Sequence, residues 1–214
     1  SDLQANDQFG AAVALDDGNR LVVGAPDGDG ENNDLTDSGM VKLITFTNDS
    51  FSGAALSSTI IDSAFVNNLP NNNLASADEL FGTAVALNGS GNRLAVGAIY
   101  DTGQPSSSSK YGAVHLYSFT DNNYSGAVLE GTIGKGYTGG KNVNFNATSG
   151  DLFTHGISLN SAGDRLAIGE TGYNSNRGAV YLYSFTDTSF TGGSLTATIA
   201  PGATNANDIN MTLD

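Results

Sequence analysis

The sequence predicts an all-β fold built from three tandem repeats, each with four short antiparallel strands. Three phenylalanines, Phe9, Phe81 and Phe153, lie 72 residues apart, and each opens a similar apolar block. Each block leads into Gly-Asn-Arg-Leu or Gly-Asp-Arg-Leu, followed by two further apolar runs. No stretch has the i, i+3, i+4 apolar spacing of a helix. Such a period is typical of supersecondary units that bury their apolar faces against one another.

Four strands are expected in each repeat, separated by residues that favour turns. They cover Ala11–Leu15, Arg20–Val23, Met40–Phe46 and Ala55–Ile60 in the first repeat, Thr83–Leu87, Arg93–Val96, Ala113–Phe119 and Val128–Ile133 in the second, and His155–Leu159, Arg165–Ile168, Ala179–Phe185 and Leu195–Ile199 in the third. Between the first two strands of each repeat lie Gly, Asn and Asp residues, which tolerate the positive φ of tight hairpins.

The repeats predict a single β-repeat domain over residues 1–214, with units at about 1–72, 73–144 and 145–214. The chain begins and ends at nearly the same phase of the repeat. This phase favours a compact pseudo-three-fold body or a cut from a longer array, and we expect the chain to be a segment of a longer protein.

The composition is acidic and contains no cysteine. There are 22 Asp and Glu residues against 8 Lys and Arg residues, for a net charge of -14. Because so few cations could neutralise phosphates, nucleic acid is excluded as a partner. The absence of cysteine excludes a disulfide framework, and the absence of a run of about 18 apolar residues predicts no transmembrane segment. The acidic, hydroxyl-rich composition favours an extracellular setting.

Two segments carry a resemblance to a known family. Phe9-Gly10 followed by Gly24-Ala25-Pro26, and Phe81-Gly82 followed by Gly97-Ala98, resemble the FG-GAP repeat of integrin α chains and bacterial surface proteins. The third copy departs from the signature, with Phe153-Thr154 and Gly169-Glu170. Residues 133–144 and 179–187 resemble repeats of very large bacterial haemagglutinin-like exoproteins. The resemblance implies four-stranded propeller blades on a protein outside the bacterial cell or at its surface.

Three arrangements of the repeats stay open at this point. Propellers close with about four to eight blades, so three blades would be crowded at the axis. The alternatives are a segment of a larger propeller, a compact three-fold β body, and units stacked in a fibre. The shared phase of the two chain ends favours the compact body.

An acidic loop is the candidate metal site. The calcium-binding hairpin of integrin repeats has no counterpart here, because the interval between the two signatures holds only Asp16-Asp17-Gly18-Asn19. After the second signature, however, Asp27, Asp29, Glu31 and Asp34 alternate with small residues. Ca²⁺ takes six to eight oxygen ligands, which such a loop could supply. The alternative, a solvated acidic loop, is favoured because the corresponding loop of the second repeat lacks these acids.

Two other sets of residues recur at equivalent positions. Arg20, Arg93 and Arg165 each open a strand, and we expect them to be structural, with Asp7, Glu79 and Asp151 as hypothetical partners. Phe51, Tyr124 and Phe190 recur at one turn, where they are expected to plug the core rather than to stack on carbohydrate.

The sequence predicts that the chain is not an enzyme. His115 is expected on an exposed strand face, and it forms no catalytic pair with His155. No nucleophile motif or zinc-ligand spacing is present. The favoured function is an extracellular repeat module of a large bacterial surface protein, serving adhesion or structural display. A self-assembling filament or surface-layer subunit is the alternative, and a glycan-binding propeller lectin is a further one. The expected partners are another protein, a glycan at a cell surface, or copies of the chain itself.

Overall fold

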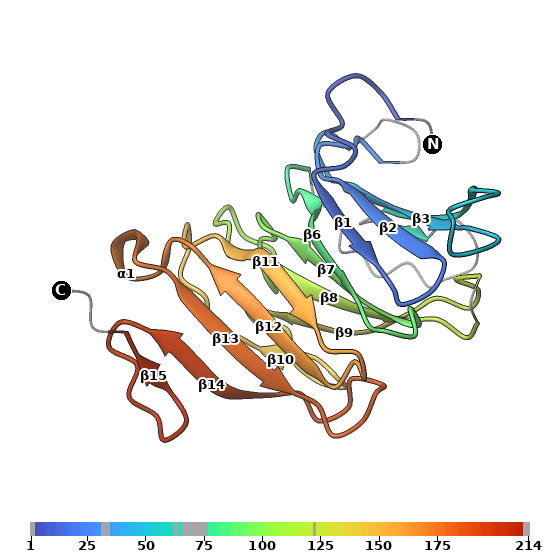
Figure 1. Ribbon diagram of the computed structural model, residues 1–214. Helices are drawn as coiled ribbons and strands as arrows, with labels where there is room; N and C mark the ends of the chain where they lie inside the picture. The colour runs from blue at the N-terminus through green and yellow to red at the C-terminus, as the bar shows by residue number, and fades with distance from the viewer. Residues whose placement is uncertain (1–2, 31–34, 62–63, 66–76, 122, 212–214) are drawn as a thin grey trace.

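The computed structural model describes residues 3–30, 35–61, 64–65, 77–121 and 123–211, and confirms an all-β fold (Figure 1). Three five-stranded sheets follow one another along the chain. The first contains β1 (Ala12–Leu15), β2 (Arg20–Ala25), β3 (Met40–Thr45), β4 (Ala55–Ile61) and β5 (Ala64–Phe65). The second contains β6 (Phe81–Leu87), β7 (Arg93–Ala98), β8 (Ala113–Ser118), β9 (Val128–Gly134) and β10 (Val143–Asn144). The third contains β11 (Phe153–Leu159), β12 (Arg165–Glu170), β13 (Ala179–Ser184), β14 (Ser194–Ala200) and β15 (Ile209–Asn210).

The prediction of four antiparallel strands per repeat is wrong in one respect. Each sheet gains a short fifth strand at its outer edge, beside β4, β9 or β14. β5 pairs antiparallel, whereas β10 and β15 run parallel to their neighbours, so two of the sheets are mixed. The chain that leaves the fourth strand thus turns back and pairs with part of an otherwise open sheet edge, which would offer unpaired backbone groups to other chains.

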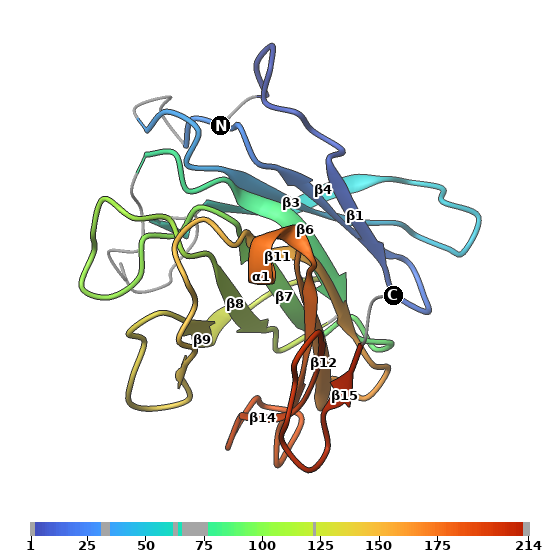
Figure 2. The ribbon, with the colours of Figure 1, turned by 90° about the vertical axis from the view of Figure 1, so that its left-hand side faces the viewer.

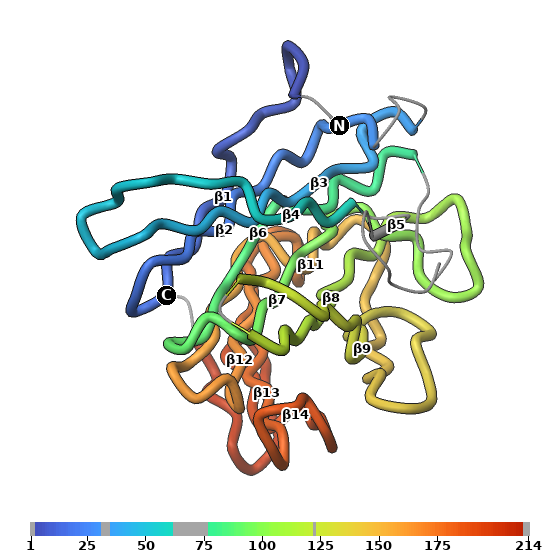
Figure 3. The backbone as a smooth tube through the Cα atoms, turned by 90° about the vertical axis from the view of Figure 1, so that its right-hand side faces the viewer, coloured from blue at the N-terminus to red at the C-terminus, as the bar shows by residue number. Residues whose placement is uncertain are grey.

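The predicted closure into a compact three-fold body is not found. Within the described residues the sheets form an open array, without a closed barrel or propeller. The second sheet lies between the other two in Figure 1. Its first strand, β6, contacts β1, β2 and β3 of the first sheet, while β11 contacts β6, β7 and β8. Figure 3 shows the sheets fanning out from β6 and β11. Each sheet packs face to face on the next, so the first and last sheets lie at opposite ends of the array.

Two apolar cores hold the array together. One lies between the first and second sheets and includes Val41, Leu43, Phe81 and Tyr117. The other lies between the second and third sheets and includes Val114, Leu116, Phe153 and Tyr183. β8 is buried along its whole length because its two faces contribute to different cores.

The only helix of the described part is α1 (Tyr173–Asn176), a single turn in the loop between β12 and β13. No helix there has the length and apolar character needed to span a membrane.

Candidate functional site

The loops that vary between repeats meet at one end of the array. The backbone N–H of Gln104 donates to the carbonyl of Lys135 at 2.8 Å, and that of Gly172 donates to the carbonyl of Asp151 at 2.7 Å. Loop 99–112 is therefore joined to loop 135–152, and loop 135–152 to loop 171–178. Figure 2 shows the first two, in green and yellow, on one side of the molecule. The repeats differ most where their loops touch.

A buried polar cluster anchors these loops to the second sheet. The hydroxyl of Tyr137 donates to Oδ2 of Asp101 at 2.8 Å, and the same oxygen lies 3.6 Å from Nε2 of His115. Nδ1 of His115 lies 3.1 Å from the hydroxyl of Thr132 on β9. The prediction that His115 is exposed is wrong, since its side chain is completely buried. The second sheet is covered on both faces, which leaves β8 without an exposed side.

Asp101, His115 and Thr132 place a carboxylate, an imidazole and a hydroxyl in a row, as in a catalytic triad. Thr132, His115 and Asp101 are buried, although Thr132 is also among the residues that line the cavity described below. The rings of Phe81 and Tyr137 flank His115, with centroids 5.7 Å and 6.3 Å away. The arrangement therefore acts as a clamp, fixing loop 99–112 and the residues after β9 to the sheet. No sequence pattern revealed it, because the three residues lie far apart in the chain.

The candidate binding site is a cavity of about 540 Å³ beside this clamp. It lies between β9 and the following glycine-rich segment, and its lining includes Gln104, Gly136, Thr138, Gly139 and Gly140. Gly139 and Gly140 have φ values of 79° and 56°, in the left-handed region that favours glycine. A β-carbon at either position would meet no atom within 4 Å. The lining combines these glycines with the polar side chains of Gln104 and Thr138, which suits a polar ligand.

One ion pair closes the inner wall of the cavity. Lys141 donates to Oε2 of Glu130 and, at 2.7 Å, to the carbonyl of Ser189 in the third sheet. Partial burial raises the pKa of Glu130, but hydrogen bonds from Lys141 and Ser118, together with the charge of Lys141, hold that pKa below its ordinary value. Glu130 is therefore ionised at neutral pH. Lys141 thus connects the cavity wall to the third sheet. Its charge and that of Glu130 neutralise each other.

The predicted metal ligands are only partly within the described residues. Glu31 and Asp34 lie outside them. Asp27 accepts a hydrogen bond from Gln8, and Oδ1 of Asp29 accepts one from the N–H of Asp37 at 3.0 Å. Within the described ranges, no group of three or more acidic or histidine side chains is placed to hold a metal. Calcium in this loop stays a prediction.

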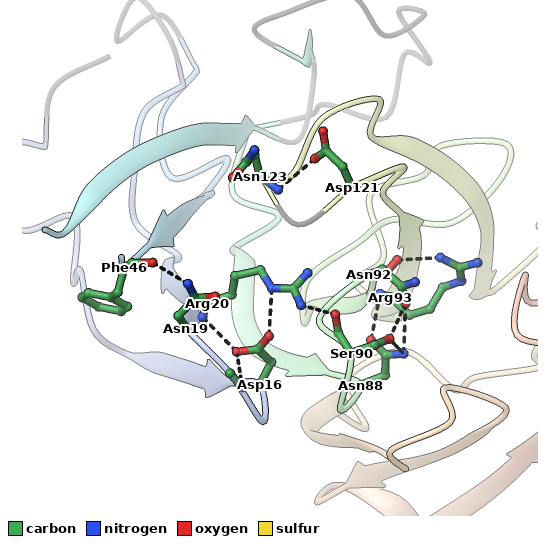
Figure 4. Close-up of polar contacts among 11 residues, drawn as sticks. Asp16, Asn19, Arg20, Phe46, Asn88, Ser90, Asn92, Arg93, Asp121 and Asn123 are labelled. Atoms are coloured by element: carbon green, nitrogen blue, oxygen red, sulfur yellow. Dashed lines mark hydrogen bonds and ion pairs between the residues drawn. The ribbon is translucent and has the colours of Figure 1, made fainter. Parts of the chain in front are cut away.

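The recurring arginines have structural partners, but these are not the hypothesised ones. Nε of Arg20 donates to Oδ2 of Asp16 at 2.8 Å, and a second nitrogen donates to the carbonyl of Ser90 in the next sheet (Figure 4). Arg93 likewise donates to a carbonyl of the next sheet, that of Thr188. The structure thus pairs Arg20 with an acid of its own turn rather than with Asp7. The first two arginines brace each sheet against the following one.

The recurring aromatic residues plug the core in the second and third repeats. Tyr124 and Phe190 are buried and pack edge to face on Phe119 and Phe185, with centroids 4.9 Å and 5.1 Å apart. Phe51 makes the same contact with Phe46 in the first repeat but remains exposed. The expectation of a core role is confirmed for two of the three positions.

The comparisons with known proteins agree with the repeat seen at the start of the chain. Residues 1–41 match the family model described as FG-GAP repeat. A comparison with curated protein sequences gives no match. Among solved structures, the chain is similar to the crystal structure of Saccharomyces cerevisiae Sqt1, with 9% sequence identity and a TM-score of 0.49. That similarity covers 96% of this chain and 38% of Sqt1, so the chain spans well under half of that protein. Residues 1–41 are thus similar to the FG-GAP repeat.

Proposed function

We propose that the chain is a non-enzymatic repeat module of a large bacterial protein, located outside the cell or at its surface. Its role would be adhesion or structural display. The observation that supports this proposal is that residues that recur between the repeats and residues that differ between them lie in separate parts of the structure. Those that recur, such as Arg20 and Phe81, make contacts within and between sheets. Those that differ lie in loops 99–112, 135–152 and 171–178, which touch at one end, and residues of the first two line an open cavity.

Several features support a module that binds rather than one that catalyses. The histidine nearest the cavity, His115, is sealed inside the sheet with its carboxylate partner. The cavity presents glycine backbone and paired charges. An FG-GAP-type repeat is also typical of extracellular β-propeller modules, which supports the proposed location. The expected partner is a protein or glycan of a neighbouring surface, bound at the loop end.

A bead-adhesion experiment tests this proposal. Fluorescent beads coated with the chain are counted after washing on a layer of cultured epithelial cells. Ser106→Arg combined with Thr138→Arg places bulk on the exposed loops at the cavity, and we expect it to reduce the retained beads about tenfold. The matched control, Ser50→Arg with Ser52→Arg, adds the same charge at an exposed hairpin turn and should retain beads like the unaltered chain. If beads coated with the unaltered chain were retained no better than beads coated with albumin, adhesion through this end would be refuted.

A further inference from the structure

The interface between the first two sheets is built around closely approaching backbones. A β-carbon at Gly24 would lie 2.0 Å from the carbonyl oxygen of Gly82, and one at Gly39 would lie 2.1 Å from that of Phe81. Gly39 and Phe81 also form a parallel β-bridge. The Phe-Gly segment of the second repeat therefore needs the two glycines of the first repeat as its seat, since any side chain there would push the sheets apart.

The interface between the second and third sheets repeats this geometry. A β-carbon at Gly112 would lie 2.4 Å from the carbonyl oxygen of Phe153, and one at Gly97 would lie 3.1 Å from the side chain of Thr154. Gly97 and Gly112 hold the places of Gly24 and Gly39, as the registers of β2 and β7 with their neighbours show. One docking mode is thus used twice in the same chain.

At the opposite end of the sheets, a series of backbone hydrogen bonds also repeats from one sheet to the next. The N–H of Asp17 donates to the carbonyl of Gly89 at 3.2 Å, and the N–H of Gly89 donates to the carbonyl of Ser161 at 3.0 Å. These residues are 72 positions apart, so each turn makes the same bond with the next turn. Continued by one step, the series would run from Ser161 to a turn equivalent to that of Asp17.

The third sheet carries an unused copy of the seat, here called the trailing face. Gly169 and Gly178, which hold the places of Gly97 and Gly112, line an open groove of about 510 Å³ together with Val180 and Ile199. A second groove of about 390 Å³ continues along the same face, and its lining includes Ala167, Leu182 and Ala197. Val114 and Ile133, the counterparts of Val180 and Ile199, are fully buried under the third sheet. The trailing face is therefore apolar, grooved and uncovered.

The first sheet carries the matching unused surface, here called the leading face. Its exposed apolar residues are Phe9, Val13, Leu15 and Leu56, with the half-buried Ile44 among them and the exposed Phe51 beside it. Val23 and Ala25, on the same face, are already buried in one copy. Phe9 is 46% exposed, whereas Phe81 and Phe153 are 0% exposed in their seats. A β-carbon at Gly10 would meet no atom within 4 Å, whereas Gly82 is packed against Gly24 and Met40. The chain thus presents a Phe-Gly segment without a seat at one end and a seat without a Phe-Gly segment at the other.

Arg165 adds a polar group to the trailing face. Arg20 and Arg93 donate to carbonyls of the following sheet, whereas within the described residues no other sheet covers Arg165. Its side chain is 57% exposed and pairs with the adjacent Asp164 at 3.1 Å. It stands where its counterparts reach across an interface, so it could donate to a carbonyl of a sheet docked there.

We propose that two copies of this chain associate head to tail, with the leading face of each seated on the trailing face of the other. Each copy supplies both surfaces, and the two internal interfaces show that these surfaces are complementary. Two copies of three sheets give six sheets, within the range of about four to eight that closes a propeller. Both contacts would be related by one two-fold axis, so the assembly is a closed dimer rather than a fibre.

Sedimentation equilibrium of the whole chain tests the dimer. The expected mass is twice the 21.9 kDa of one chain, falling to a single chain on dilution. Phe9→Glu on the leading face and Ala197→Glu on the trailing face should each weaken the dimer about 30-fold or more, because each buries a carboxylate in an apolar seat. Both sites are at least partly exposed in one copy, so the folding of each variant, followed by circular dichroism and melting temperature, should be unchanged.

A mixing experiment distinguishes a head-to-tail contact from a symmetric one. The Phe9→Glu chain keeps an intact trailing face and the Ala197→Glu chain an intact leading face, so an equimolar mixture should regain a dimer with one contact. Val128→Glu is the matched control, since Val128 is exposed on the outer edge of the middle sheet and should not alter the mass. A chain that stays single at 100 times the working concentration, open-ended polymers, or a dimer unaffected by Ala197→Glu would each overturn the proposal. The first of these results would leave the faces to further repeats of a longer chain.

Discussion

The first strands of the first two repeats contain the same four residues in different surroundings. Both β1 and the second half of β6 read Ala-Val-Ala-Leu, yet Val13 and Leu15 are exposed while Val85 and Leu87 are buried. β6 has a sheet in front of its apolar face and β1 has none. In a repeat array the burial of a residue is decided by its neighbours, so an end unit shows the surface that an inner unit hides.

The largest expected effect comes from truncating the signature phenylalanine in each setting. Phe81→Ala should lower the free energy of unfolding by about 3–5 kcal/mol, because it empties a fully buried site between two sheets. Phe9→Ala should cost under about 1 kcal/mol, because that ring is half exposed in a single copy. Urea denaturation followed by circular dichroism, at a protein concentration where the chain is single, gives both values. Equal losses would show that the two environments do not differ.

A second comparison uses the arginines that follow the first hairpin turns. Arg20→Met should lower the free energy of unfolding by about 2–4 kcal/mol, because it leaves the buried carboxylate of Asp16 without its cation. Arg165→Met should change stability by less than about 0.5 kcal/mol, since its ion pair with Asp164 is largely exposed. The same denaturation measurement applies. A small effect at Arg20 would mean that the backbone hydrogen bonds to Asp16 suffice to hold the turn.

The strands and turns could be predicted from the sequence because they depend on local patterns. The expected strands agree with the main strands of each sheet to within a few residues, since alternating apolar residues and Gly-Asn or Gly-Asp turns act over short distances. The plugging role of Tyr124 and Phe190 followed from their recurrence at one turn. The partners of Arg20 were missed because Asp16, four residues away, was considered only as part of a turn.

Features that depend on the third dimension were not predictable from these patterns. His115 aligns with Lys42 and Tyr181, which suggested a tolerant exposed position, but all three side chains are buried. The cluster of Asp101, His115 and Thr132 joins a loop with two strands, so no residue spacing in the sequence predicts it. The open ends of the array also depend on how sheets stack, which a period of 72 residues does not specify.

The smallest expected effect concerns a buried carboxyl group that the third repeat has and the first two repeats lack. Glu170 stands where the other repeats have Ala25 and Ala98, and its buried side chain lies beside Tyr181 on the face of β12 that packs against the second sheet. Burial raises its pKa from 4.5 to about 7, although a hydrogen bond from the Tyr181 hydroxyl opposes this shift. Because the folded chain holds this proton more tightly than the unfolded chain, its contribution to stability is complete below pH 4.5 and is lost as the pH rises through about 7.

Glu170→Gln should remove this pH dependence, which amounts to about 1–3 kcal/mol between those pH values for a partly screened group. Urea denaturation of both proteins at intervals from pH 4 to 8 measures the difference. Glu130→Gln is the control, because the pKa of Glu130 is lowered, so its contribution is lost only in more acidic solution. Identical pH profiles for the unaltered chain and Glu170→Gln would mean that the hydrogen bond from Tyr181 offsets the effect of burial on the carboxyl group. The interface between the second and third sheets would then hold a charge that the interface between the first and second sheets, with Ala98 at that place, does not have to bear.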